Sequence, residues 1–519
     1  MKYFATVALL LCFFIVQSQN ISFQGKFSYN QEISDVWGYV DEFGNQYALV
    51  GAFEGFSVLD VTDPTNIQEV FYEAGPKSTW RDIKVWNDHA YITNENTGGV
   101  LIVDLSPLPS SNAFPLDTLY GWPNFFTSAH NIWIDENGFA YIFGANQKEG
   151  GAIIFDLSQP KNPQEVGIVD DFYLHDGFVR NDTLWGSAIY EGLQVMYDVS
   201  DKSNPQLIGS FETPGKFAHN CWPSENSDYV FTTDEIPGGY IGAYSVMDFD
   251  DPYQVGKYRL GGSALPAPIP HNSMVKGNLL FTSYYSEGLH VLDISNPLAM
   301  VEVGKYDTSP NFVNGFHGAW GVYPYFNSDK ILIADIEEGL FVLDATNLPT
   351  PGFIVGDVRD IVSKNPITGC TIDIIGMGSY QTTQFGNYAA GVKNTGSYSV
   401  RFSKPGYRDT TLTNVIINQG ATQQLDAFLT PTNGVPSTSI NNQFVEANPL
   451  IFPNPFNNEL NFSDAMSFDE VEILDMKGSV VLQTQERQLL NLQSLPKAPY
   501  LLRLKKENHT ILQELIFKR

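Results

Sequence analysis

Five of the eight histidines in this 519-residue chain occupy one recurring position, at the start of a short apolar segment. They are His130, His175, His219, His271 and His317. The residues that follow them are Asn131, Asp176, Asn220, Asn272 and Gly318. A neutral imidazole ligates Zn, Cu or Ni, and an imidazole also exchanges protons near neutral pH. The pattern therefore indicates two kinds of chemistry, metal binding and acid-base catalysis.

Acidic residues recur at a second position, in turns expected to open at the same end of the fold as the histidines. They are Glu54, Glu95, Glu149, Glu191, Asp234, Glu235, Glu287 and Glu338. A carboxylate beside an imidazole orients the ring, completes a metal site or acts as a general base. The candidate cofactor is a divalent metal, and its candidate ligands are the five histidines with Glu191 and Glu287. The candidate ligand-binding residues at this mouth are Glu54, Glu191, Asp234, Glu235, Glu287 and Glu338.

The elements that must position these residues form a repeat. A glycine motif that ends in Asp, such as Glu54-Gly-Phe-Ser-Val-Leu-Asp60, returns roughly every 40 to 50 residues. The motif glycines are Gly55, Gly99, Gly151, Gly192, Gly239, Gly288 and Gly339. Short β-branched and aromatic runs separated by Gly, Pro, Asn and Asp turns predict four strands in each repeat. Seven such units predict a seven-bladed β-propeller around a central channel.

The two ends of the repeat region are expected to join. Residues 21–29 look like the fourth strand of a repeat, and the seventh repeat lacks such a strand after Asp344. We therefore expect the N-terminal strand to pair beside Gly339 to Asp344 and to remove the exposed edges of an open array.

Three roles for the histidine position compete. Each His-Asn or His-Asp pair could hydrogen-bond the backbone of the neighbouring blade, two neighbouring histidines with a glutamate could hold an off-axis metal ion, or the histidines could act directly in acid-base catalysis. Blades packed about 10 Å apart put seven equivalent positions on a circle of about 11 Å radius. Five histidines therefore cannot share one axial ion, and strict repetition favours the structural role. The recurring motif Asp, such as Asp60, is expected to accept local backbone hydrogen bonds.

Leu101-Ile-Val-Asp104 and Gly288-Leu-His-Val-Leu-Asp-Ile-Ser-Asn-Pro297 resemble the LVIVD repeat of secreted bacterial β-propeller proteins of the choice-of-anchor B type. The resemblance extends over the propeller, for which we expect residues 19–349. It implies a fold and an export route but no reaction.

Two small β-sandwich domains are expected after the propeller. Residues 353–430 resemble the carboxypeptidase regulatory-like domain, through segments such as Gly396-Ser-Tyr-Ser-Val-Arg-Phe402. A linker is expected at residues 431–447. Residues 448–519 resemble the C-terminal sorting domain of the type IX secretion system of Bacteroidetes, through Pro453-Asn-Pro455 and Leu474-Asp-Met-Lys-Gly478. That resemblance implies an address tag read by the type IX machinery, and hence a secreted or cell-surface location at the outer-membrane exterior.

Residues 1–18 have one Lys, an apolar stretch and a small final residue, as in a secretory signal peptide. No later stretch approaches the roughly 20 apolar residues of a membrane span. The chain has 29 Lys and Arg against 58 Asp and Glu, a formal net charge of -29. Such a polyanion is repelled by phosphate backbones, so nucleic acid is excluded as a partner.

Ordinary catalytic signatures, such as a Gly-x-Ser-x-Gly elbow or a P-loop, are absent from the sequence. The leading hypothesis is a non-catalytic, exported binding protein whose acidic, histidine-rich mouth takes a protein, a glycan or a cation. The alternative is a metal-dependent hydrolase or lyase with His175, His219 and His271 as ligands and Glu191 or Glu287 as base.

Overall fold

The computed structural model describes residues 18–261, 267–309, 315–432, 451–452, 456–462, 468–475, 479–485, 489–506 and 509–518. Most of the expected signal segment, most of the expected linker, the Pro453-Asn454-Pro455 turn and residues 476–478 lie outside these ranges. Only strands, turns and loops occur among the described residues. None of them forms a helix long and apolar enough to cross a membrane.

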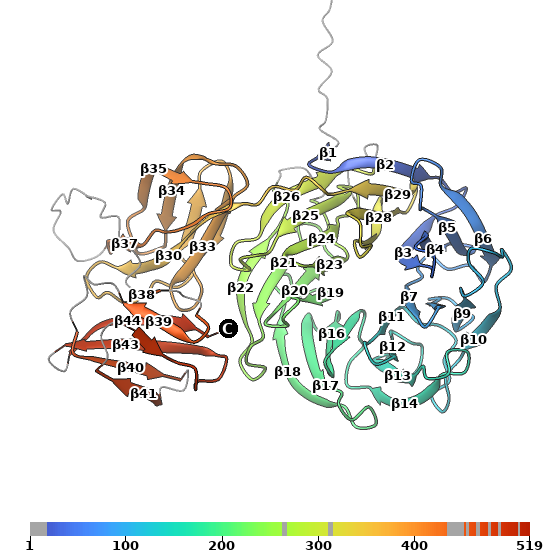
Figure 1. Cartoon of the computed structure of the whole chain (residues 1–519), viewed down its shortest axis with the longest axis horizontal. Coiled ribbons are helices and arrows are strands. Elements are labelled where there is room, and N and C mark those ends of the chain that lie inside the picture. Colours follow the sequence, from blue (N-terminus) through green and yellow to red (C-terminus); the bar gives the residue numbers. More distant parts are fainter. Residues whose placement is uncertain are drawn as a thin grey trace, which may run out of the picture. The chain divides into compact units, whose positions relative to one another are not determined.

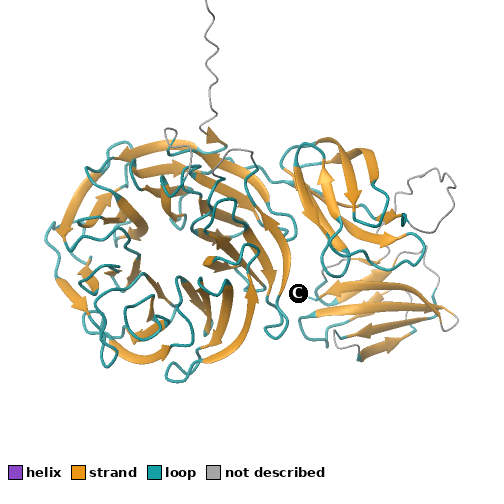
Figure 2. Ribbon diagram, turned by 180° about the vertical axis from the view of Figure 1, so that it is seen from behind, coloured by secondary structure: helices purple, strands orange, loops and turns teal. Residues whose placement is uncertain are grey.

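Seven antiparallel sheets surround a central channel and form the propeller (Figures 1 and 2). Blade 1 contains β3 (Ile33–Val40), β4 (Gln46–Ala52), β5 (Gly55–Asp60) and β6 (Gln68–Ala74). Blade 2 contains β7 (Ile83–Trp86), β8 (His89–Ile92), β9 (Val100–Asp104) and β10 (Leu116–Leu119). Blade 3 contains β11 (Asn131–Ile134), β12 (Phe139–Phe143), β13 (Ala152–Asp156) and β14 (Gln164–Val169). Blade 4 contains β15 (Gly177–Arg180), β16 (Thr183–Ala188), β17 (Leu193–Asp198) and β18 (Gln206–Glu212).

The remaining blades complete the circle. Blade 5 contains β19 (Ala218–Pro223), β20 (Tyr229–Asp234), β21 (Ile241–Ser245) and β22 (Tyr253–Tyr258). Blade 6 contains β23 (Ser273–Lys276), β24 (Leu279–Ser283), β25 (Leu289–Asp293) and β26 (Val301–Tyr306), to which β1 (Ser18–Gln19) adds a fifth strand. Blade 7 contains β27 (Ala319–Tyr323), β28 (Lys330–Asp335), β29 (Gly339–Asp344) and β2 (Ser22–Phe27). The first strand of each blade is the innermost one.

The N-terminal strand closes the ring, which confirms the expected closure. β2 pairs antiparallel with β29, with Ser22 opposite Asp344 and Phe27 opposite Leu340. The strand that begins the propeller is therefore the outer strand of its last blade, and blade 7 presents no unpaired outer edge along β29.

The recurring glycine and aspartate have local structural roles. A Cβ at Gly55 would lie 2.1 Å from the carbonyl oxygen of Glu73 in the adjacent strand, and one at Gly339 would lie 2.3 Å from that of Phe27. No side chain fits there, so the position needs glycine. The Asp that ends the motif accepts a backbone N–H two residues later, as in Thr62 N to Asp60 Oδ1 at 2.9 Å. This agrees with the structural role expected for that Asp.

Two further pairs of sheets follow the propeller. The first pair contains β30 (Gly352–Asp360), β33 (Asn387–Val392), β36 (Thr422–Gln424) and β37 (Ala427–Leu429) in one sheet. Its second sheet contains β31 (Thr371–Ile374), β32 (Gly378–Gln381), β34 (Gly396–Ser403) and β35 (Thr410–Ile417). The chain divides into two compact units, and most of the second consists of residues 432–519.

That second unit has its own core. One sheet contains β38 (Ile451–Phe452), β39 (Glu459–Phe462) and β42 (Leu489–Asn491). The other contains β40 (Glu470–Leu474), β41 (Val480–Thr484), β43 (Pro499–Lys506) and β44 (His509–Phe517). Buried apolar residues such as Leu460, Ile473 and Leu502 pack together between them. The described chain is thus all-β, a seven-bladed propeller followed by two small β-sandwiches.

Candidate functional site

The innermost strands all begin at one end of the channel, and the residue after the histidine position links neighbouring blades there. Its side-chain oxygen accepts a backbone N–H from the innermost strand of the next blade. The pairs are Asp35 with Ile83 at 3.2 Å, Asp82 with Ile132 at 2.9 Å and Asn220 with Ser273 at 3.1 Å. Only the third contact comes from a His-Asn pair, and His271 itself also hydrogen-bonds the backbone oxygen of Trp320 in the next blade at 2.7 Å, so both members of these pairs make interblade contacts.

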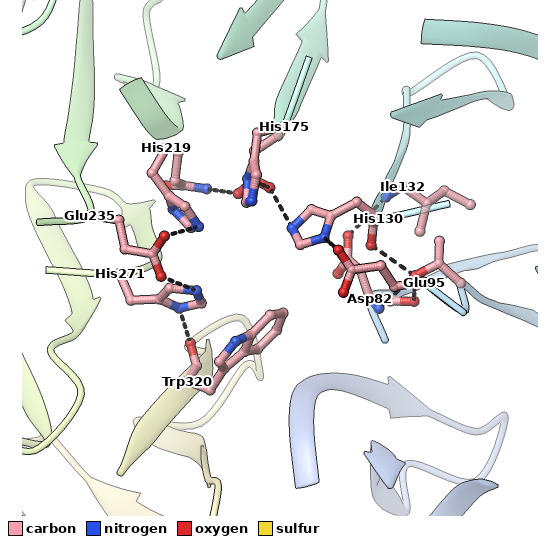
Figure 3. Close-up of polar contacts among 12 residues, drawn as sticks. Asp82, Glu95, His130, Ile132, His175, His219, Glu235, His271 and Trp320 are labelled. Atoms are coloured by element: carbon pink, nitrogen blue, oxygen red, sulfur yellow. Dashed lines mark hydrogen bonds and ion pairs between the residues drawn. The ribbon is translucent and has the colours of Figure 1, made fainter. Parts of the chain in front are cut away.

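Four of the five histidines lie in a continuous row that we call the histidine arc: His130, His175, His219 and His271. Figure 3 shows their rings pointing toward the channel axis from successive blades. Neighbouring ring centroids are 3.9 Å apart for His130 and His175, 4.4 Å for His175 and His219, and 4.5 Å for His219 and His271. Carboxylates divide the arc into two groups.

The first group, called the blade 5–6 group, consists of His219, Glu235 and His271. Glu235 directly follows β20 and lies between the two rings. Its Oε2 is 3.5 Å from His219 Nε2, and its Oε1 is 3.8 Å from His271 Nε2. One ligand atom from each of the three residues lies within 4.8 Å of the other two. Atoms bound to one tetrahedral zinc at about 2.0 to 2.1 Å lie about 3.4 Å apart, so small movements would bring these atoms onto one ion.

The protons of the blade 5–6 group are fixed by its neighbours. His271 Nδ1 is 2.7 Å from the backbone oxygen of Trp320. A carbonyl oxygen only accepts, so Nδ1 carries the ring proton and donates it. Burial lowers the pKa of His271 to about 4, so the ring is neutral near pH 7. Its Nε2 lone pair then faces the carboxylate of Glu235.

Burial also shifts the pKa values of Glu235 and His219. Burial raises the pKa of Glu235 to about 7, although Tyr285 donates a hydrogen bond to Oε1 at 2.5 Å. Burial, and then the nearby His175, lower the pKa of His219 well below its usual value. The His219 side chain is only 2% exposed, and its Nδ1 has no hydrogen-bond partner among the described residues. Because His271 Nε2 and the Glu235 carboxylate are acceptors that face each other, the group has a place for a proton or a cation.

The second group, called the blade 3–4 group, consists of His130, His175 and Asp176. Asp176 Oδ1 is 3.8 Å from His130 Nε2 and 3.1 Å from His175 Nδ1. These three residues also offer ligand atoms within 4.8 Å of one another. His130 Nδ1 is 3.1 Å from Glu95 Oε1, so the outer partner of this ring is a carboxylate. Asn220 donates to the other oxygen of Asp176 at 3.2 Å.

The rings of the blade 3–4 group differ in charge. Burial disfavours the protonated form of His130, but the hydrogen bond with Glu95 and the charges of Asp176 and Glu95 outweigh it and raise its pKa. Burial and the charge of His130 lower the pKa of His175 well below its usual value. His130 is therefore the arc member that most readily carries a proton.

Several candidate residues lie outside the arc. His317 is half exposed and pairs with Glu337 at 2.5 Å. Glu191 is exposed, and neither it nor Glu287 lies within ion-pair distance of an arc histidine in the described chain. Glu54 pairs with Lys77 at 2.9 Å, and Glu338 pairs with Lys26. Asp234 is buried, and it accepts hydrogen bonds from the Thr213 hydroxyl at 2.5 Å and the Gly215 N–H at 2.6 Å.

None of the carboxylates that contact the histidine arc was predicted from the sequence to be a metal ligand. Glu235 was placed only among the ligand-binding residues at the mouth. Glu95 was only one member of the recurring acidic position, and Asp176 only the residue after His175. Tyr285 had no assigned role at the site. The available signal was the doubled acid Asp234-Glu235, a feature that the seventh repeat shares in Glu337-Glu338.

Three tryptophans, each three residues after the histidine position of its repeat, and one tyrosine form an aromatic layer in the channel. Trp37, Trp133, Trp222 and Tyr325, from blades 1, 3, 5 and 7, contact one another in a closed circuit. The centroid distances are 6.3 Å for Trp37 and Trp133, 5.0 Å for Trp133 and Trp222, 5.8 Å for Trp222 and Tyr325, and 6.2 Å for Trp37 and Tyr325. Because rings from non-adjacent blades touch, this layer separates the arc from the other end of the channel.

Comparisons with known families agree with the domain types. Residues 79–114, 127–171, 191–213 and 272–308 match the LVIVD repeat, residues 354–430 the carboxypeptidase regulatory-like domain, and residues 450–518 the secretion system C-terminal sorting domain. Comparison with the curated proteins gives no match.

Three solved structures are similar over 62% of this chain. One is a catalytically inactive virginiamycin B lyase from Staphylococcus aureus with quinupristin, at 13% identity, a TM-score of 0.45 and 99% coverage of that chain. The second is U3-55K, at 6% identity, a TM-score of 0.47 and 98% coverage. The third contains the RRP9 WD40 repeats, at 7% identity, a TM-score of 0.46 and 97% coverage.

The chain is an exported β-propeller protein. It carries LVIVD repeats, a carboxypeptidase regulatory-like domain and a C-terminal sorting domain, and this last domain marks it for type IX secretion to the cell surface or beyond.

Proposed function

We propose that this exported propeller binds a divalent transition-metal ion through His219, Glu235 and His271. The observation that carries the proposal is the neutral His271 ring, whose Nε2 lone pair faces the Glu235 carboxylate across 3.8 Å. Two acceptors at this distance repel each other unless a proton or a cation lies between them. Of the ligands left open by the sequence, which were a protein, a glycan and a cation, this geometry favours the cation.

The surroundings of the group support the same conclusion. Metal-bound histidines commonly donate their other N–H to a backbone carbonyl, as His271 does to Trp320. The Tyr285 hydroxyl holds Glu235 in the same way that ligating carboxylates are held. Two imidazoles and one carboxylate suit Zn, Cu or Ni better than Ca or Mg, which prefer oxygen ligands.

We propose binding rather than catalysis. A metal-dependent hydrolase or lyase needs a base that stands beside the ion without being its ligand. Glu235 is occupied as a ligand in the proposed site, and the bases named from the sequence, Glu191 and Glu287, lie outside ion-pair distance of the arc histidines in the described chain.

The test is metal analysis of the purified exported protein after zinc loading and extensive dialysis, for wild type, His271→Ala and His317→Ala. His317 occupies the same repeat position but is half exposed and lies outside the arc, so it is the matched control. We expect zinc to be retained by wild type and by His317→Ala, and affinity to fall at least 100-fold in His271→Ala. Equal retention by all three proteins, or retention by none, would overturn the proposal.

A further inference from the structure

The arc repeats one arrangement twice. In the blade 5–6 group Glu235 lies between His219 and His271, and in the blade 3–4 group Asp176 lies between His130 and His175. Both groups bring three potential ligand atoms within 4.8 Å of one another. His130 is 7% exposed and Asp176 is 3% exposed, so the second group is shielded from water in the same way as the first.

Partners on the outside of the rings hold the blade 3–4 group in position. Glu95 accepts from His130 Nδ1 at 3.1 Å, which leaves Nε2 directed at Asp176. Asn220 donates to Asp176 Oδ2 at 3.2 Å, and His175 Nδ1 faces the other oxygen, Oδ1, at 3.1 Å. Metal-ligating histidines and carboxylates are commonly held by such outer hydrogen bonds, so Glu95 and Asn220 stand where the supporting partners of a metal site stand.

One cation in the blade 5–6 group leaves His130, His175 and Asp176 unengaged, because its ligands are His219, Glu235 and His271. The three remaining residues offer ligand atoms within 4.8 Å of one another and have the same composition, two imidazoles and one carboxylate, which suits Zn, Cu or Ni.

We propose that a second divalent transition-metal ion binds to His130, His175 and Asp176, so that the channel mouth holds a pair of ions. The inference rests on the proposed function for its first ion. His175 and His219, one ligand from each group, have ring centroids 4.4 Å apart. With metal–nitrogen bonds of about 2.0 Å, ions on these two rings lie within about 11 Å of each other. Paramagnetic ions at such a separation are close enough for their electron spins to couple through space.

The experiment has two readouts on the full-length exported protein. Zinc stoichiometry is measured by titration and metal analysis, and Cu(II)-loaded protein is examined by electron paramagnetic resonance for coupling between the ions. Wild type is expected to bind two equivalents and to show coupled Cu(II) signals. His130→Ala and His271→Ala are each expected to bind one equivalent with an uncoupled signal, and His317→Ala is expected to match wild type.

The wild-type result decides the question even if a variant fails to fold. Two equivalents with coupling support the pair. Wild type could instead bind one equivalent of zinc, which His130→Ala keeps and His271→Ala loses. That result overturns the second ion and leaves the proposed function standing. Two equivalents without coupling overturn the pairing of the sites. No retained metal overturns both proposals.

Discussion

The blade 5–6 group and the blade 3–4 group use the same parts, two histidines at the repeat position with one carboxylate between them. They differ in the group that accepts a hydrogen bond from Nδ1 of the histidine at the end of the arc, which is His271 in one group and His130 in the other. A neutral backbone carbonyl accepts from His271, and the pKa of His271 falls to about 4. A carboxylate, Glu95, accepts from His130, and the pKa of His130 rises. The charge of the outer partner thus decides whether an equally buried ring tends to be neutral or protonated.

The bridging carboxylates differ as well. Glu235 comes from a hairpin of blade 5, is held by a tyrosine hydroxyl and has a pKa raised to about 7 by burial. Asp176 belongs to the same repeat as His175 and faces His130, whose pKa is raised. A metal ion proposed for the blade 3–4 group would therefore compete with a proton at His130, while His271 offers an unprotonated nitrogen near neutral pH. Four experiments test this difference.

The largest effect is expected from Glu235→Gln. The substitution keeps the shape and removes the charge, so zinc affinity should fall at least 100-fold. Above pH 7, metal-free protein should gain about 1 to 3 kcal/mol of unfolding free energy, because the ionised carboxylate is disfavoured by burial. Isothermal titration and denaturant melts in chelator measure the two quantities.

Asp176→Asn is the matched substitution in the other group. Metal-free protein should lose about 1 to 3 kcal/mol, because a protonated His130 loses a buried counter-charge. Equal signs for the two stability changes would contradict the distinction between the groups.

The second effect concerns pH, measured as the stability difference between wild type and His271→Gln in chelator. Unfolded histidine binds its proton near pH 6.5, while folded His271 binds it near 4. The neutral ring therefore contributes stability above pH 6.5 that is lost as pH falls from about 6.5 to about 4. The difference should shrink by about 2 to 3 kcal/mol between pH 7.5 and 4.5.

His130→Gln should show the opposite trend. The folded pKa of His130 is raised, so its contribution is complete below pH 6.5 and is lost as pH rises through the folded pKa. The stability difference from wild type should therefore widen on acidification. Parallel pH profiles for the two variants would show that the outer partners do not set the charge of the rings.

The third effect is expected from Tyr285→Phe, which removes the donor to Glu235 and keeps the ring beside His271. Loss of such a supporting hydrogen bond should weaken zinc binding about 10-fold. Tyr173→Phe is the control, since Tyr173 contacts the His175 ring in the other group. Zinc titrations that show the same loss for both variants would assign the effect to general packing.

The smallest effect is expected from His317→Ala. The side chain is half exposed, so the unfolding free energy should change by less than about 0.5 kcal/mol and zinc affinity should stay unchanged. Measurably weaker zinc binding in titrations would mean that the metal site includes His317 of blade 7.

The sequence was sufficient for the fold because its signals are local. The motif glycines recur where a Cβ would meet a carbonyl oxygen, as at Gly55, and the N-terminal strand resembles the strand that blade 7 lacks. Both features follow from backbone geometry that every blade shares. The repeat pattern also located the histidine row.

The partners within the row could not be predicted, because side-chain reach and turn geometry differ from blade to blade. Glu235 reaches two histidines because it follows the strand directly, while Glu191 sits exposed in a different turn. His317 precedes Gly318, whose φ is 93°, and a Cβ at Gly318 would lie 2.6 Å from the Tyr285 carbonyl oxygen. That left-handed turn directs His317 away from the row, and Trp320 packs against His271 instead.

The pairing of β2 with β29 has a consequence for the time course of folding. Phe27 lies near the beginning of the exported chain, and its partner Leu340 comes after all seven innermost strands. β2 therefore has no place to dock until the last blade exists, and contacts so distant along the chain form slowly. Completion of the ring, and with it a fixed spacing around the channel mouth, is a late event that any truncation before residue 344 would prevent.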